Sequence, residues 1–438
     1  MNHAPTPSPS AGEISRLTEH LFRHESGKLV SVLTGLFGLD RLDLAEDVVQ
    51  EALVRALQTW PYYGIPKNPA AWITQTAKNL ALDLVRRENL FRQKVPKITV
   101  AFESAGAEIP ADTSPLFEEE IRDDRLRLMF ACCHPQVPAE AQSALALKTL
   151  CGFSVGEIAR AFLTTEAAIA KRLVRARHKI RELKIPFEIP AGKECSRRLE
   201  GVLETLYLLF NEGYKASSGD HLVRAELCQE AIRLTTLLSQ HPVGNAPRVH
   251  ALLALMCLNA ARLPARVDAD GNLLRLAEQD RSHWNTELIA RGLSHLDQSA
   301  TGATFTEFHL QAAIAACHCT APNYESTDWP RILSLYDRWI ELNPSPIVAL
   351  NRAVAVAHVN GPAAAILILE SIPDRKSIES YYLYHAVLGE FEFQLGKSSE
   401  AAAHLRQALR LADLKSEQDF LARKLRECDL AQGMERTR

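Results

Sequence analysis

A short stretch between residues 153 and 184 constrains the fold most, because it predicts two short helices in succession with cations on the second. Ser154 and Glu157 have the spacing of a capping box, so the first helix should begin at Val155. Thr164 or Thr165 can cap the second helix. The pattern therefore predicts a helix-turn-helix, a motif that can place its second helix in the DNA major groove.

The second helix concentrates positive charge in a chain whose net charge is only −3. Seven lysines and arginines stand between positions 171 and 184 against one acid, Glu182. Such cations suit phosphates, and the first turn of the helix suits base edges. The alternative is a solvated basic helix held by tertiary packing alone. The residues predicted to face DNA are Thr165, Ala168, Lys171, Arg172, Arg175, Arg177 and Lys179.

The chain as a whole is expected to be almost entirely α-helical. Its 438 residues exceed one ordinary core, so two to four domains are expected. Proline and glycine separate apolar runs of helical length, whereas alternating β-type runs are scarce. The chain has no uninterrupted run of about 18 apolar residues, so no membrane span is expected. The first dozen residues are rich in Pro and Ser and lack a signal-peptide pattern.

The nine cysteines show no disulfide framework, which suits a reducing cytosol and predicts a cytoplasmic protein. Residues 132–134 (Cys-Cys-His) and 317–319 (Cys-His-Cys) resemble clustered metal ligands, but neither has a second ligand pair at a zinc-finger spacing. We expect them to be buried side chains and predict no metal. No phosphate loop, nucleophile elbow or His-Glu metal spacing is present, so we expect no cofactor and no catalytic residue.

Five sections follow from the punctuation of the chain. Residues 1–13 are expected to be a disordered tail, and residues 14–94 a helical domain. Residues 95–117 contain three prolines and lack helical periodicity, which predicts a linker. Residues 118–186 should hold the helix-turn-helix domain, and residues 187–438 a long helical section.

The C-terminal section shows weak internal repetition. Gly389, Ala401 and Ala408 are small residues placed where the two helices of a tetratricopeptide-like (TPR-like) hairpin would cross closely. Segments 360–367 and 395–405 are similar and lie one repeat apart. Helical-hairpin arrays commonly bind proteins on a concave face, which suggests a protein partner. A merely structural helical lobe is the alternative.

The first domain carries two amphipathic helices. Residues 40–58 place Leu44, Val48, Ala52 and Ala56 on one stripe and acidic residues opposite. An acidic face is better suited to bind a basic protein surface than phosphate. The alternative is an ordinary surface helix, which would show the same pattern of residues. The residues predicted to bind this partner are Asp43, Asp47, Gln50, Glu51 and Arg55.

The next helix begins at Asn68, a cap followed by proline at the first helical position. Its polar faces combine amides and cations with an indole, groups that suit unpaired bases and the DNA backbone. A helical tryptophan is also a common core residue. The residues predicted to contact DNA here are Trp72, Lys78, Asn79, Asp83, Arg86 and Arg87.

Together these segments resemble the extracytoplasmic-function group of bacterial sigma factors. AEDVVQEA (45–52) is similar to the polymerase-binding helix of that group, and AWITQTAKNLALDLVRR (71–87) to its −10 segment. GEIA (156–159) and KRLVRAR (171–177) are similar to its −35-reading domain. The resemblance covers roughly residues 15–185, with order and spacing preserved.

The resemblance implies a non-enzymatic protein with two partners, core RNA polymerase and promoter DNA. Residues 43–55 would contact the β′ clamp helices, the 72–87 set the −10 element, and the 165–179 set the −35 element. The linker would thread toward the RNA-exit region, with the β flap as a further contact. The group often has Thr or Ser where this chain has Ala168, which removes one polar contact to the −35 element.

The C-terminal section resembles the extension of one sigma-factor subgroup, in which such a domain is thought to regulate activity. The expected fold is thus two small helical sigma domains followed by a TPR-like helical-hairpin domain. The main rival is a one-component helix-turn-helix regulator with a helical sensing domain, which leaves residues 40–88 without a function. An enzyme, or a scaffold without DNA binding, are the remaining alternatives.

Overall fold

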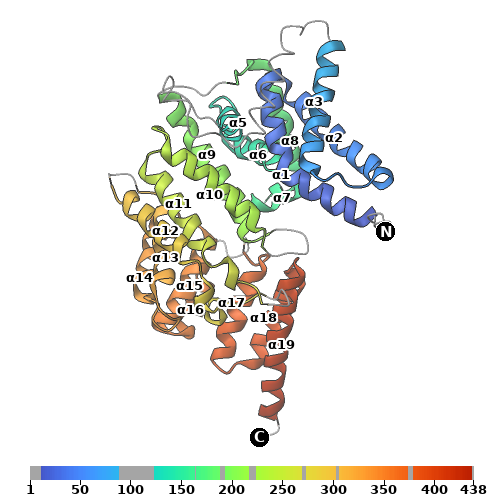
Figure 1. Cartoon of the computed structure of the whole chain (residues 1–438). Helices are drawn as coiled ribbons and strands as arrows, with labels where there is room; N and C mark the ends of the chain where they lie inside the picture. The colour runs from blue at the N-terminus through green and yellow to red at the C-terminus, as the bar shows by residue number, and fades with distance from the viewer. Residues whose placement is uncertain are drawn as a thin grey trace. The chain divides into compact units, whose positions relative to one another are not determined.

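The computed structural model describes residues 11–87, 123–162, 164–187, 193–216, 223–268, 273–301, 305–372 and 378–436. Over these ranges the chain is built from helices, and the β pairing is a single isolated bridge between Val267 and Leu273 (Figure 1). The expected all-α fold is therefore confirmed. The chain divides into two compact units: Met1–Leu209 with Gln240–Gly244, and Phe210–Ser239 with Asn245–Arg438.

The first module of unit 1 comprises α1 (Ala11–Phe37), η1 (Leu39–Arg41, a 3-10 turn), α2 (Leu42–Tyr63) and α3 (Pro69–Arg87). Helix α2 packs against both α1 and α3. Val48, Ala52 and Ala56 are buried as expected, but Leu44 is only partly buried. Ala45 takes the core position instead, because the buried stripe also runs through 49, 53 and 60, which shifts its centre.

The second module comprises α5 (Asp124–Cys132), α6 (Ala139–Leu150), α7 (Val155–Ala161) and α8 (Glu166–Leu183). The predicted capping box is present: the backbone N–H of Glu157 donates to Ser154 Oγ at 3.1 Å, and the N–H of Ser154 donates to Glu157 Oε2 at 2.7 Å. Ile158, Ile169 and Leu173 form the buried side of the pair. Helix α8 ends at Leu183, and its C-cap Lys184 has a left-handed φ of 47°.

The division between the units falls inside α9 (Lys193–Tyr214). The part of α9 that belongs to unit 1 packs on the second module, where the Arg198 guanidinium donates to the Phe130 carbonyl at 3.2 Å. Ser143 Oγ donates to Glu204 Oε2 at 2.9 Å. A Cβ at Gly201 would lie 2.7 Å from Gln142 Oε1, so the helices approach closely. Unit 1 thus extends past residue 186, while the expected linker (95–117) lies outside the described residues.

Unit 2 begins with α10 (Ala225–Gln240, assigned to this unit up to Ser239), α11 (Pro247–Ala260), α12 (Thr286–Ser299), α13 (Glu307–Thr320) and α14 (Trp329–Leu342). Short 3-10 turns η2 (Leu263–Ala265), η3 (Leu276–Glu278) and η4 (Arg281–His283) connect α11 to α12. Helix α11 is buried on nearly every side and packs against α12 and α13. It is the central helix of this part of the unit.

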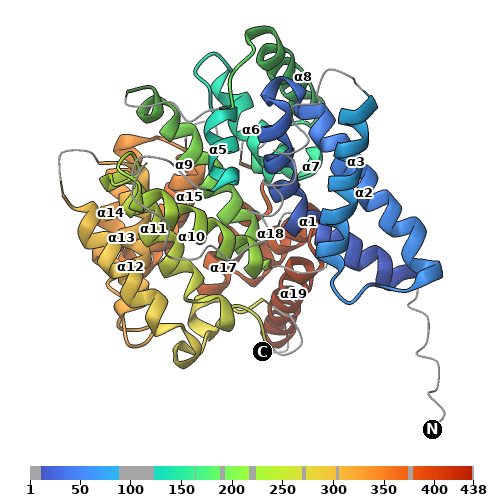
Figure 2. The same cartoon turned by 45° about the horizontal axis from the view of Figure 1, so that its top comes forward.

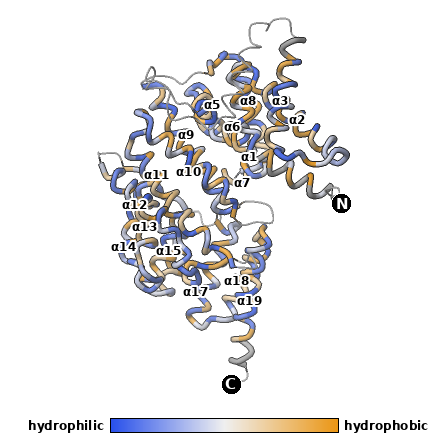
Figure 3. Tube along the Cα trace, in the orientation of Figure 1, coloured by the Kyte–Doolittle hydropathy of each residue, from blue (hydrophilic) through white to orange (hydrophobic). Residues whose placement is uncertain are grey.

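The unit continues with α15 (Pro346–Asn360), α16 (Pro362–Glu370), α17 (Tyr382–Gln394), α18 (Ser398–Leu411) and α19 (Lys415–Arg436). Successive helices pack as pairs, and α17, α18 and α19 lie side by side in two views (Figures 1 and 2). Polar and apolar positions alternate in short blocks along these helices, as expected where each buries one face (Figure 3).

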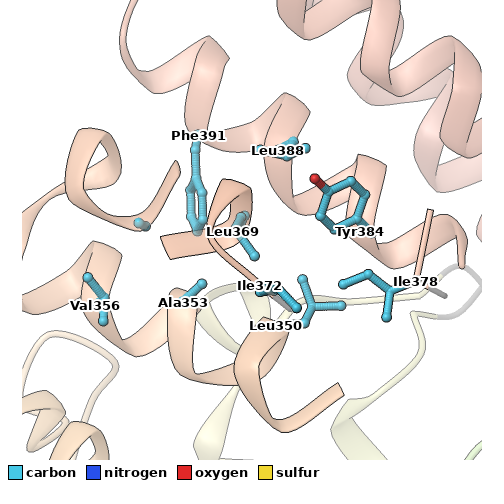
Figure 4. Packing of buried hydrophobic residues seen from close by; sticks show 10 residues of the cluster. Leu350, Ala353, Val356, Leu369, Ile372, Ile378, Tyr384, Leu388 and Phe391 are labelled. Carbon is cyan, nitrogen blue, oxygen red and sulfur yellow. The ribbon is translucent and has the colours of Figure 1, made fainter. Parts of the chain in front are cut away.

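Two cores hold the C-terminal helices together, one among α15, α16 and α17 and the other among α17, α18 and α19. Leu369 of α16 and Tyr384, Leu388 and Phe391 of α17 converge on α15 (Figure 4). Small residues permit the α17–α18 contact, as the sequence predicted: Ala401 and Ala408 are fully buried. A Cβ at Gly389 would meet the Ala401 carbonyl at 3.1 Å. The region is helical throughout its described residues, and its TPR-like character stays a prediction.

Candidate nucleic-acid interface

Helix α8 presents the N-terminal half of the predicted DNA face to solvent. Thr165 is the N-cap, and its Oγ1 accepts a hydrogen bond from the N–H of Ala168 at 3.3 Å. Lys171 and Arg175 are exposed, and neither has an ion-pair partner among the described residues. Arg172 is partly buried and pairs with Glu140 of α6 at 2.7 Å. The exposed cations of this half are therefore Lys171 and Arg175.

The C-terminal half of α8 is engaged within the protein. The guanidinium of Arg177 lies 2.7 Å from Glu46 Oε2 and 3.5 Å from Asp43 Oδ1, both on α2. Arg181 also reaches Asp43, at 3.1 Å. Lys179 pairs with Glu182 along the helix at 3.2 Å. The structure thus brings Arg177, predicted to bind DNA, together with Asp43, predicted to bind a protein.

The remaining predicted residues of α2 form an exposed face. Asp47, Gln50 and Glu51 are open to solvent, and Arg55 pairs with Glu51 at 3.0 Å one turn along the helix. A pair between exposed i and i+4 side chains stabilises the helix by only about 0.3–0.5 kcal/mol. These groups are consequently available to a partner at little cost.

Sequence reasoning missed the apolar continuation of this face. Val54 and Leu57 are more than 40% exposed, and Tyr62 and Tyr63 more than 80%. Val54 and Leu57 continue the helical spacing of Asp47 and Gln50, so the face runs from acidic to apolar. The signal in the sequence was present: both apolar residues fall off the buried stripe. Exposed aromatic and aliphatic side chains grouped with charges are typical of protein-binding surfaces.

Glu46 is a second residue that sequence reasoning missed. It points away from the exposed face, and its side chain is only 16% exposed. Besides Arg177, it accepts a hydrogen bond from Thr149 Oγ1 of α6 at 3.0 Å. Burial raises the pKa of this carboxyl, while Arg177 and then Thr149 oppose the increase. No local pattern marks such a residue, because its partners lie more than 100 positions away.

The predicted −10 residues of α3 differ in exposure. Trp72 is half-buried, and its ring meets the buried Trp60 ring edge-on, with centroids 5.6 Å apart. Lys78 is also half-buried, whereas Asn79 and Asp83 are exposed. Asn79 Oδ1 accepts a hydrogen bond from Gln75 Nε2 at 3.0 Å. The side chains of Arg86 and Arg87 lie outside the described residues.

The clustered cysteines and histidines occupy packing positions. Cys132 and Cys133 are buried, and burial raises the pKa of Cys133 to about 12. The ring of His318 lies edge-on against Trp329, with centroids 5.4 Å apart. Within the described ranges no three His, Cys, Asp or Glu side chains are grouped to hold a metal ion. None of the described helices is long and apolar enough to cross a membrane.

Three protein families match the chain. Sigma-70 region 2 matches residues 21–90, and Sigma-70 region 4 matches residues 127–180. A family of unknown function, DUF6596, matches residues 198–300. An uncharacterized protein of Rhizobium meliloti (strain 1021) is 41% identical over 385 residues, which cover 88% of this chain and 90% of that protein. No solved structure matches.

Proposed function

The chain belongs to the sigma-70 family of transcription initiation factors, and from that premise we propose that it is an extracytoplasmic-function sigma factor regulated by its own C-terminal helices. At the coarser level, its region 2 and region 4 make it a non-catalytic factor that binds core RNA polymerase and directs it to promoter DNA. The observation that carries the proposal is the presence of both regions in order, with region 4 folded as a helix-turn-helix.

We assign polymerase binding to the exposed face of α2. Asp47, Gln50 and Glu51 offer carboxylate and amide groups to a basic surface, and Val54 and Leu57 supply apolar area beside them. Charges steer such an encounter, whereas the apolar side chains contribute more of the affinity. The β′ clamp helices are the proposed partner surface, and Asp43 and Arg55 would lie at its edge.

We assign the promoter to α3 and α8. The −10 element would meet Trp72, Lys78 and Asn79 with Asp83, Arg86 and Arg87 beside them, and the −35 element would meet the 165–179 face. Exposure of Lys171 and Arg175 supports base or phosphate contacts by these two residues in particular. Each neutralised phosphate contributes about 0.9 log units of affinity per log unit of salt.

The C-terminal part, by this proposal, controls how the factor engages polymerase. Its support is the size of the helical section after α9 and its paired helices, which suit the binding of a protein partner. A chain ending after Ala216 keeps all of α9 and tests this role. Promoter-dependent transcription should change markedly. Equal output from the shortened chain, folded by circular dichroism, would remove the control role but not the sigma activity.

The sigma function is tested by separating its two binding activities. Asp47→Ala should weaken capture by core RNA polymerase, with promoter recognition by any holoenzyme that forms unchanged. Lys171→Ala should leave capture unchanged and weaken transcription from the cognate promoter. Lys415→Ala, on the exposed surface of α19, serves as the control. A one-component regulator would bind its operator without any stable complex with core enzyme, and that result would contradict the proposal.

A further inference from the structure

Unit 2 contains a group of buried side-chain nitrogen atoms that have no hydrogen-bond partner. Arg262 lies two residues after α11, Trp284 is the C-cap of η4, and His318 lies in the last turn of α13. Arg262 Nε, Trp284 Nε1 and His318 Nδ1 are each buried, and none has a partner in the described part of the chain. Buried polar atoms in proteins are nearly always hydrogen-bonded, so three unpartnered nitrogens indicate a missing acceptor.

The three residues lie together with a fourth, Arg281 of η4. The guanidinium carbons of Arg262 and Arg281 lie 5.4 Å and 4.8 Å from the centroid of the Trp284 ring. Arg281 Nη1 donates to the carbonyl of His318 at 2.8 Å, which joins η4 to the end of α13. These four residues, all within unit 2, are called the basic cluster below.

The basic cluster carries positive charge that no carboxylate pairs with. Neither arginine forms an ion pair with any of the described residues. Burial, followed by the charge of Arg262, lowers the pKa of Arg281, and the opposing effect of Glu325 is smaller. Burial, followed by both arginines, lowers the pKa of His318 to about 3, so its ring is neutral at pH 7. Like charges held close together cost free energy, which a bound anion would offset.

The two arginines differ in how many donors they leave open. Arg281 Nη1 also donates to the Ala321 carbonyl, and its Nη2 lies 3.5 Å from Thr327 Oγ1, so this guanidinium is fixed on the end of α13. Arg262 makes no hydrogen bond through its guanidinium to any described residue. Both side chains are only partly buried, so a solute can reach them. Arg281 therefore supplies a positioned charge, and Arg262 supplies free donors.

We propose that the basic cluster binds the phosphate group of a small molecule. A phosphate dianion matches the charge of two guanidinium groups, and its oxygens can accept from Arg262 Nε and Trp284 Nε1 together. A carboxylate carries one charge and two oxygens, which would leave part of the cluster unpaired. The site does not depend on the proposed sigma function, because every residue in it belongs to unit 2.

Aromatic side chains beside the basic cluster suit the organic part of a phosphate monoester. The Trp329 ring meets His318 edge-on and stacks on His358, with centroids 5.4 Å and 3.7 Å apart. Tyr324 lies edge-on to the same indole at 5.8 Å, and its hydroxyl is 3.0 Å from His358 Nε2. Bases stack on such rings, so a nucleoside monophosphate should bind more tightly than inorganic phosphate.

Two substitutions test the site, each with a matched control in the same unit. Arg262→Gln removes the free charge, and Trp284→Phe removes one N–H while keeping a ring. Each should weaken phosphate binding about tenfold or more, as expected for a lost hydrogen bond to a charged group. Arg338→Gln is the first control, because its guanidinium also lies over an aromatic ring, 5.1 Å from the centroid. Trp339→Phe is the second, because its Nε1 already has an acceptor at 3.0 Å. Both controls should bind phosphate as the wild type does.

Thermal unfolding separates a binding role from a structural one. Without phosphate, Arg262→Gln should melt at a temperature at least as high as the wild type, because it removes a charge that has no partner and repels Arg281. Trp339→Phe should melt lower, because it breaks a hydrogen bond that is made. Added ligand should raise the melting temperature of the wild type with concentration, and that of Arg262→Gln much less.

Binding is measured on the full chain by isothermal titration calorimetry in a phosphate-free buffer. The probes are inorganic phosphate, adenosine monophosphate, adenosine and acetate. Adenosine monophosphate should bind most tightly and inorganic phosphate next, with adenosine and acetate far weaker. The chain has five tryptophans, so the indole N–H signal of Trp284 is identified in an NMR spectrum as the one missing from Trp284→Phe. That signal should move as phosphate is added, because the N–H gains an acceptor.

Equal binding of inorganic phosphate and adenosine monophosphate would support the phosphate site and exclude a role for the aromatic rings. Acetate bound as tightly as phosphate, or adenosine as tightly as its monophosphate, would overturn the proposal. No heat and an unmoved Trp284 signal would mean that the cluster holds water alone, which also overturns it. If Arg262→Gln fails to fold, Trp284→Phe decides the comparison of affinities. None of these outcomes changes capture by core RNA polymerase, which tests the sigma function separately.

Discussion

Ser154 determines where the helix-turn-helix begins. Its hydroxyl satisfies a backbone N–H at the start of α7, and Glu157 returns a hydrogen bond to the Ser154 N–H although its own side chain is buried. Because α7 has only seven residues, it gains little from its own helical hydrogen bonds. The cap and the packing of Ile158 therefore carry most of its stability.

Ser154→Ala should lower the free energy of unfolding by about 1 kcal/mol, because the N–H of Glu157 loses its acceptor. Ser154→Asp keeps an acceptor at the same position and should restore most of the loss. Urea denaturation of the full chain, followed by circular dichroism, measures both. An unchanged midpoint in Ser154→Ala would show that the helix start is held by packing alone.

At the scale of the element, α8 presents two different surfaces. One carries Lys171, Val174 and Arg175 into solvent, and the other carries Arg177 and Arg181 against α2. The split follows from helical geometry. Positions 171 and 175 lie one turn apart on one side, whereas position 177 lies about 160° around the helix axis from position 175. One face of the helix is therefore open to a partner, whereas the other is engaged within the protein.

The open face of α8 yields a prediction about specificity. Arg175→Ala or Lys171→Ala should cost about 1–3 kcal/mol at the cognate promoter if the side chain reads a base. A phosphate contact would instead weaken binding to every sequence and lower the salt slope by roughly 0.9. Competition binding of holoenzyme to cognate and scrambled promoter DNA distinguishes the cases, with Lys415→Ala, on the exposed surface of α19, as the comparison. Unaltered affinity for both DNAs would exclude the assignment.

The sequence predicted contacts between residues close together in the chain and missed those between residues far apart. The caps at Ser154 and Thr165 were predictable because donor and acceptor lie three positions apart. The small residues at Gly389 and Ala401 were recognisable from repeat spacing. The engagement of Arg177 was not, because Glu46 lies 131 positions away and local patterns carry no information about that pairing. The packing of α9 on the second module could not be predicted from the sequence for the same reason.

At the scale of the whole molecule, histidines whose pKa burial lowers are concentrated in unit 2. Unit 2 contains two histidine pairs with facing nitrogens: Nδ1 atoms lie 3.1 Å apart in His250–His295 and 3.0 Å apart in His385–His404. Burial, followed by His250 and Arg291, lowers the pKa of His295 to about 4. Burial, followed by two arginines, lowers that of His318 to about 3.

Unit 2 should therefore lose stability as the pH falls. An unfolded histidine takes up a proton near pH 6.5, whereas folded His295 and His318 do so only near pH 4 and pH 3. The unfolded chain consequently binds more protons between these values, so the stabilising contribution is complete above about pH 6.5 and is lost on acidification. The melting temperature of the full chain should drop between pH 7 and pH 5.

The measurement is differential scanning calorimetry across that range, with His295→Gln as the diagnostic variant. Removing one histidine whose pKa is lowered should flatten the pH dependence of the melting temperature, whatever the variant does to the melting temperature at pH 8. Gln298→Ala, at an exposed side chain of the same unit that does not titrate, should leave the pH dependence as it is. A wild-type melting temperature that rises toward pH 5 would contradict the sign of the argument.

All nine cysteines are free thiols, and eight of them are buried. The ninth, Cys319, is partly covered, and burial raises its pKa to about 11, as it does for Cys257. Native thiolate is thus scarce at neutral pH. A maleimide dye should therefore leave the native cysteines unlabelled and react with a single new cysteine introduced at an exposed position. This sigma factor could carry a fluorescent reporter through a transcription cycle with none of its own cysteines replaced.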